Sequence, residues 1–237
     1  MSNDFNDPIS RTSTYSMPID AGLRSYMISV YNYMAMALGL TGLVAFFVAS
    51  QPALVNAIFG TPLAYVIIFA PLVMVYLISA NLTKYKFQTV QTLFWVYAAL
   101  MGLSLSSIFM IYAMGSIAKM FLITSSVFGA MSIYGYTTQK DLTSWGTFLF
   151  MGVVGILIAM IVNLFLQSGP LDYALSVITV LIFTGLVAYD TQTIKSFYNP
   201  NDSAEKSGKF AIYGAMQLYI DFINIFLALL RLFGDRR

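Results

Sequence analysis

The chain has 237 residues, of which 59% are hydrophobic and only 9% are charged, with 12 Lys and Arg against 10 Asp and Glu. Soluble domains carry about 25% charged residues, so a chain this poor in charge cannot cover a water-facing surface. The sequence also lacks His and Cys, which excludes disulfides, imidazole or thiolate metal ligands, Cys nucleophiles and His general bases. The few basic residues are scattered and indicate no nucleic-acid partner. We expect a membrane protein that is not an enzyme, needs no cofactor and has the lipid bilayer as its main partner.

Seven long apolar segments follow one another along the chain. Each runs 20 to 24 residues, which matches the roughly 20 helical residues needed to cross about 30 Å of hydrocarbon. A β-barrel would show shorter segments of alternating polarity, and none is present. Only four charged residues fall inside the segments, namely Lys119, Asp190, Asp221 and Arg231. The sequence predicts an all-α membrane protein with seven transmembrane helices, over residues 27–50, 62–81, 89–112, 117–138, 145–167, 173–192 and 210–233.

The remaining residues predict the organisation around these helices. Residues 1–26 are polar and are expected to form a disordered cytoplasmic tail, followed by a seven-helix transmembrane domain over residues 27–237. The apolar stretch 52–60 is too short to span and is expected to lie in the interface. With the N-terminus inside, eight of the 12 Lys and Arg lie on the cytoplasmic side, as the positive-inside rule requires. Basic residues at the C-terminus leave open whether the last helix spans or re-enters, and we favour spanning.

Two aspartates lie at membrane depth on consecutive helices. Asp190 follows Tyr189 and precedes Thr191 near the end of the sixth segment, and Asp221 lies in the seventh. Gln217, Asp221 and Asn224 are spaced i, i+4 and i+7, which places them on one face of a helix. Because a carboxylate facing lipid costs several kcal/mol, this face is expected to meet protein or water.

Helical rise puts Asp190 and Asp221 at similar depth in adjacent antiparallel helices, roughly 10 and 12 Å from the inner side. Two carboxylates this close in a low dielectric cannot both ionise easily, so the pair is expected to titrate as a unit. The plainer interpretation is that each aspartate only hydrogen-bonds polar neighbours and fixes the helix register. Intramembrane carboxylates are more often functional, and the pair is therefore our candidate site, with Tyr189, Thr191, Gln217 and Asn224 as supporting polar groups.

Three stretches of the sequence resemble one known family. GLVAYDTQTIK (185–195), LYIDFINIFLALLRLFG (218–234) and FGAMSIYGYTTQKDLTSWG (128–146) are similar to the motifs of the Bax inhibitor-1 family, in the expected order, with a bacterial character. The resemblance covers essentially the whole chain after the tail. It implies seven helices of which the last is central and surrounded by the other six, and a localisation in the bacterial inner membrane.

The same resemblance implies a pH-sensitive calcium leak in which Asp190 and Asp221 form the gating pair. Calcium prefers six to eight oxygen ligands, so these two carboxylates would bind it weakly and transiently, as conduction requires. One departure concerns an arginine near the inner end of the second helix, which latches onto the sixth-helix aspartate in some bacterial members. Asn81 stands near that place here.

Two other functions remain as alternatives. The first is a regulatory interaction protein that modulates a membrane protease or another stress-response partner, for which deletion of the polar tail is the test. The second is an intramembrane aspartyl protease, because a Tyr-Asp on one helix and an Asp on the next are similar to that arrangement. It is disfavoured because Asp221 lacks the Gly-x-Gly that precedes the second aspartate there.

Overall fold

The computed structural model describes residues 21–237, and this part of the chain is almost entirely helical. Seven helices are long and apolar enough to cross a membrane, which confirms the predicted fold class. The predicted tail lies outside the described residues up to residue 20, and residues 21–26 form the first turns of α1. The helices are α1 (Ala21–Ala49), α2 (Pro52–Phe59), α3 (Leu63–Asn81), α4 (Phe87–Leu105), α5 (Ile108–Ile111), α6 (Met114–Thr137), α7 (Thr143–Leu166), α8 (Gly169–Ser196) and α9 (Ala204–Phe233).

Several helices extend beyond the apolar segments that predicted them. The last one begins at Ala204, six residues before the predicted start, because the Ser203 hydroxyl accepts a hydrogen bond from the backbone N–H of Lys206 at 3.3 Å. Glu205 in the first turn also suits the positive end of the helix dipole. Hydropathy detects only the apolar part of such a helix, so it does not predict the polar turns at the helix ends.

The third predicted segment is interrupted. The structure ends α4 at Leu105 and resumes with the single turn of α5. Ser106 Oγ donates to the carbonyl of Leu103 at 2.7 Å, and Ser107 Oγ donates to the carbonyl of Ser104 at 3.4 Å. Serine hydroxyls that bond nearby carbonyls compete with the helical ladder, and here they accompany the break.

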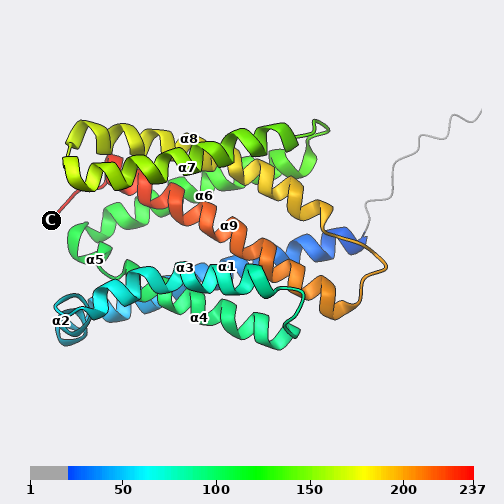
Figure 1. Ribbon diagram of the computed structural model, residues 1–237, viewed down its shortest axis with the longest axis horizontal. Coiled ribbons are helices and arrows are strands. Elements are labelled where there is room, and N and C mark those ends of the chain that lie inside the picture. The colour runs from blue at the N-terminus through cyan, green and yellow to red at the C-terminus, as the bar shows by residue number, and fades with distance from the viewer. Residues whose placement is uncertain (1–20) are drawn as a thin grey trace, which may run out of the picture.

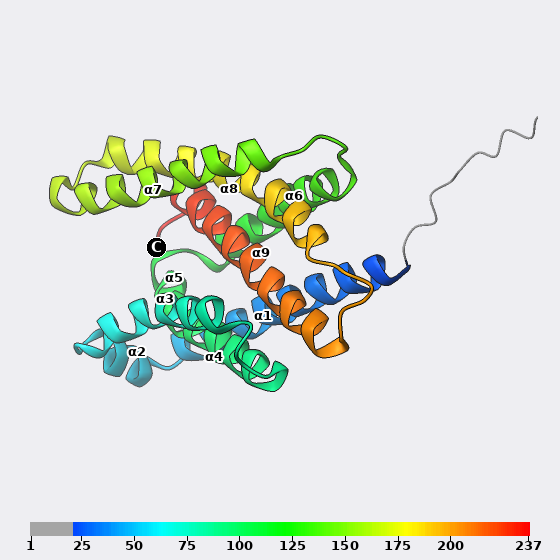
Figure 2. The same ribbon diagram turned by 45° about the vertical axis from the view of Figure 1, so that its right-hand side comes forward.

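The most buried helix is α9. In its most apolar 18-residue stretch 61% of the residues are buried, whereas in the other six spanning helices the share is 11–33%. It packs against α8, α1, α6, α4 and α3, and it runs diagonally between the other helices (Figures 1 and 2). The outermost helix is α7, which reaches the bundle through α8. The faces of α3 and α7 that remain exposed are apolar, as contact with lipid requires.

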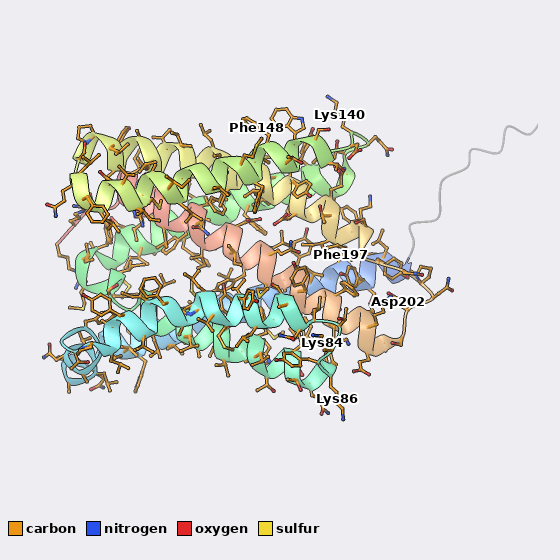
Figure 3. All side chains as sticks on the ribbon, in the orientation of Figure 1. Lys84, Lys86, Lys140, Phe148, Phe197 and Asp202 are labelled. Carbon is orange, nitrogen blue, oxygen red and sulfur yellow. The ribbon has the colours of Figure 1, made fainter. Side chains whose placement is uncertain are left out.

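The two ends of the bundle differ in what they present. Lys84, Lys86, Lys140 and Asp202 lie at the end where α1 begins (Figure 3), and the C-terminus lies at the opposite end (Figure 1). The last helix therefore crosses the whole bundle, as favoured from the sequence. Beyond it the chain pairs with the segment before α6, where the backbone N–H of Ala113 donates to the carbonyl of Asp235 at 3.0 Å. Which end faces the cytoplasm remains a prediction.

Candidate functional site

The carboxyl groups of Asp190 on α8 and Asp221 on α9 lie within hydrogen-bonding reach of each other. The side chain of Asp221 is 3% exposed, and within residues 21–237 no N–H or hydroxyl donates to its buried Oδ2 atom. Asp190 is partly buried. A carboxylate without donors in a low dielectric is costly, so the geometry suits either a proton shared between the two groups or a cation beside them.

Small residues let the helices around the pair approach closely. Gly214 of α9 lies against Ile194 of α8, where an added Cβ would come within 2.8 Å of the Ile194 side chain. Gly135 of α6 lies against the backbone of Ala188, where a Cβ would come within 2.8 Å of the Cα atom. At both positions a Cβ would force its neighbour to shift, and at Gly135 that neighbour is backbone, which cannot move without its helix. Tight packing on two sides thus fixes α8 beside α9 and holds Asp190 opposite Asp221.

A cavity of about 640 Å³ opens at the pair. It lies between α7, α8 and α9, with Leu72 of α3 at its edge. Gln217, Asp221 and Asn224 all line it, as the i, i+4, i+7 spacing predicted. Gln217 Oε1 is buried and accepts no hydrogen bond from the described residues, and Asn224 Nδ2 donates to the carbonyl of Ile220 at 2.8 Å. The cavity is therefore apolar apart from a short row of oxygen-bearing groups beside the carboxyl pair.

The two neighbours of Asp190 in the sequence point in different directions. The ring of Tyr189 packs against Gly146 of α7 and lines the cavity. Thr191 is fully buried on the α6 side, where its hydroxyl bonds Ser132 Oγ at 3.0 Å. Successive helical residues are about 100° apart, which is why only Tyr189 accompanies the carboxyl pair in the cavity. Thr191 supports the site through the packing of α8 on α6.

Two polar contacts next to the site were not predicted. Ser132 Oγ also bonds the hydroxyl of Tyr31 at 2.8 Å, which joins α1, α6 and α8. Thr41 Oγ1 lies 2.7 Å from the hydroxyl of Tyr219, two residues before Asp221. The first had a partial signal in the sequence, since Ser132 and Gly135 are small residues three positions apart, on one face of the helix. The Thr41–Tyr219 contact joins residues 178 positions apart, and no local pattern in the sequence indicates it.

The donor set at the pair limits what it can bind. Residues 21–237 contain no group of three or more His, Cys, Asp or Glu placed to hold a metal ion. Two carboxylates and the amide oxygens of the cavity fall short of the six to eight ligands of a tight calcium site. In place of an arginine latch, Asn81 donates to the carbonyl of Leu77 in its own helix at 3.1 Å. The site thus suits a cation that binds weakly.

Comparison with known proteins agrees with this fold. A family model described as "Inhibitor of apoptosis-promoting Bax1" matches residues 23–237. Inner membrane protein YbhL of Escherichia coli (strain K12) is 44% identical over 220 residues, which cover 92% of this chain and 94% of that protein. Protein RP147 of Rickettsia prowazekii is 48% identical over 226 residues, 95% of this chain and 96% of its own. Membrane protein SpyM3_0260 of Streptococcus pyogenes serotype M3 is 35% identical over 218 residues, 91% and 94% of the two chains. This multi-pass membrane protein therefore belongs to the Bax inhibitor family.

Proposed function

We propose that the protein is a pH-sensitive cation leak, with calcium as the permeant ion and the Asp190–Asp221 pair as its gate. The observation that supports this most is the meeting of two carboxyl groups from different helices in a cavity within the span. A structural aspartate would be surrounded by donors, whereas Oδ2 of Asp221 accepts none from the neighbouring N–H and hydroxyl groups of the described chain.

The proposed gating follows from the charge of the pair. At low pH both carboxyl groups are protonated, so a hydrogen bond between them holds α8 against α9 and the cavity carries no net charge. At higher pH both groups ionise, the carboxylates repel each other, and a cation in the cavity offsets the repulsion. Gln217 and Asn224 supply further oxygen atoms along the same face of α9. Because the ligand set is incomplete, the ion is released again, which conduction requires.

The test is calcium flux into proteoliposomes measured between pH 5 and 8, for the full chain and for Asp190→Asn and Asp221→Asn. Two opposite unit charges about 4 Å apart attract by ~4 kcal/mol at an effective dielectric constant of about 20. A change of about 1.4 kcal/mol in binding free energy already changes the affinity for the ion tenfold. We therefore expect flux at pH 8 to fall at least about tenfold in either variant, with a flattened pH profile. Asp141→Asn, which changes an exposed carboxylate between α6 and α7, is the matched control. Wild-type flux and pH response in Asp221→Asn would refute the proposal.

For the location we propose the bacterial inner membrane with the N-terminus in the cytoplasm. The name of the relative YbhL as an inner membrane protein and the excess of lysines at the end where α1 begins support this. Labelling of single cysteines introduced at Lys84 and at Lys119 in whole cells tests it. A membrane-impermeant reagent should modify only the second position, since Lys84 lies at the end where α1 begins (Figure 3), whereas Lys119 lies near the start of α6, beside the C-terminal segment at the other end.

A further inference from the structure

A second hollow lies away from the aspartate pair, between α1 and α6. It has a volume of about 510 Å³, within the range of about 300–1,000 Å³ typical of ligand pockets. Arg24 and Tyr136 lie at the end of the bundle where α1 begins, and Tyr31, Phe128 and Ser132 lie deeper, with Gly129 in the wall. We call this hollow the α1–α6 groove.

The α1–α6 groove is apolar along its length and cationic at one end. From Arg24 to Tyr31 the helix rises about 10 Å, and from Phe128 to Tyr136 it rises about 12 Å, so the groove runs along the helices and into the hydrocarbon. Met27, Ile28 and Ile133 supply more of its apolar wall. A hollow of this shape and direction suits an acyl chain that lies parallel to the helices.

Arg24 lines the groove where a lipid headgroup would lie, and a second cation, Lys195, contacts Tyr136 in the groove wall. Arg24 is exposed, and no carboxylate within residues 21–237 forms an ion pair with it. Lys195 of α8 donates to the carbonyl of Tyr136 at 3.0 Å, and its Nζ lies 5.1 Å from the centre of the Tyr136 ring. Basic pockets between transmembrane helices on the cytoplasmic side bind anionic lipid headgroups. The charge at the mouth therefore selects an anionic over a zwitterionic lipid.

We propose that the α1–α6 groove binds one anionic phospholipid, with an acyl chain along Tyr31 and Phe128 and the phosphate at Arg24. Tyr31 and Ser132 line the groove and are hydrogen-bonded to each other, and Ser132 is also bonded to Thr191 of α8 behind the groove wall. A chain in the groove therefore covers the contact that ties α6 to α8. Binding to this site does not depend on whether the protein conducts ions, and it is measured without a flux assay.

The test is native mass spectrometry of the detergent-solubilised full chain, titrated with phosphatidylglycerol or with phosphatidylcholine of the same acyl chains. We expect one phosphatidylglycerol to bind more tightly than phosphatidylcholine. Arg24→Gln should lower the affinity for phosphatidylglycerol about fivefold, since the attraction of one basic residue for an anionic headgroup corresponds to a change in affinity of about that size. Lys84→Gln, which removes an exposed cation at the same end of the bundle but outside the groove, should have no effect.

A second pair of variants tests the apolar part. A Cβ added at Gly129 meets nothing within 4 Å, so Gly129→Leu places its side chain in the groove and should abolish the bound lipid. Gly115, on the same helix but outside the groove, also has open space around an added Cβ, and Gly115→Leu should bind lipid as the wild type does. Equal loss in Arg24→Gln and Lys84→Gln would mean a diffuse surface charge and would overturn the proposal. So would equal binding of the two lipids, or unchanged binding in Gly129→Leu. Arg24→Gln changes an exposed residue, which keeps the proposal testable if the leucine variant does not fold.

Discussion

The contact between Gly135 of α6 and Ala188 of α8 should decide how closely these helices pack. In Gly135→Ala the new Cβ would lie 2.8 Å from Cα and 2.9 Å from the carbonyl carbon of Ala188. The carbonyl oxygen of Ala188 would lie closer still. Ordinary carbon contacts need at least about 3.5 Å, and backbone atoms cannot rotate away, so the helices must separate by at least about 0.7 Å. One turn along, this would lengthen the 3.0 Å contact between Ser132 and Thr191 to about 3.7 Å, beyond hydrogen-bonding distance.

The free energy of unfolding should respond in a predictable way. Overpacking costs about 1–3 kcal/mol and the lost hydrogen bond about 0.5–1.5 kcal/mol, whereas Ala gains about 1 kcal/mol over Gly in helix propensity. We expect a net loss of about 1–3 kcal/mol in Gly135→Ala, which lowers Tm by about 2–12 °C for a chain of this size. Gly129→Ala on the same helix, where a Cβ meets nothing within 4 Å, should instead raise Tm by about 2–4 °C. Thermal unfolding in one detergent checks both, and an equal change in Tm for the two variants would refute the reasoning.

Two further predictions concern hydrogen bonds elsewhere in the chain. Tyr219→Phe should cost about 0.5–1.5 kcal/mol of unfolding free energy, because Thr41 keeps its 2.8 Å hydrogen bond to a backbone carbonyl of α4. Thr41→Val should cost about 1–3 kcal/mol, because it leaves the buried Tyr219 hydroxyl without a partner. Thermal unfolding compares the two variants, and a larger loss in Tyr219→Phe would contradict this. In the loop before α7, hydrogen bonds from the side chain and backbone N–H of Thr143 lower the pKa of Asp141, so their contribution to stability is present above the ordinary pKa and is lost as the pH falls through the lowered one. Thr143→Val should raise this pKa toward its ordinary value in an NMR titration of the carboxyl carbon, and an unchanged pKa would mean that the backbone N–H alone is responsible.

Hydropathy and charge predict the spanning helices because the bilayer imposes them. A helix that crosses hydrocarbon must be apolar for about 20 residues whatever it packs against, so all seven are visible in the sequence. Their ends are less visible, because Ser203 begins α9 by a local cap six residues before the apolar segment. The hydroxyl groups of Ser106 and Ser107 accompany the end of α4 inside a segment whose hydropathy is continuous.

The site could be predicted only in part, for a related reason. The face of α9 is a property of one helix, so Gln217, Asp221 and Asn224 could be assigned to it from their spacing alone. The partners of that face belong to tertiary packing. Nothing local to Thr41 indicates that it meets Tyr219.

The residues around Asp190 show why a contiguous motif can serve several interfaces at once. Ala188 touches a glycine of α6, Tyr189 packs against a glycine of α7, and Thr191 bonds a serine of α6. Asp190 alone of the four faces the carboxyl group of Asp221 on α9. Because each step along a helix turns by about 100°, four adjacent residues meet three different helices, and α8 cannot rotate about its axis without breaking a tight contact. The carboxyl pair is therefore held in register by neighbours that carry no charge, and a larger side chain at Ala188, which lies against Gly135, should disturb the pair without changing either aspartate.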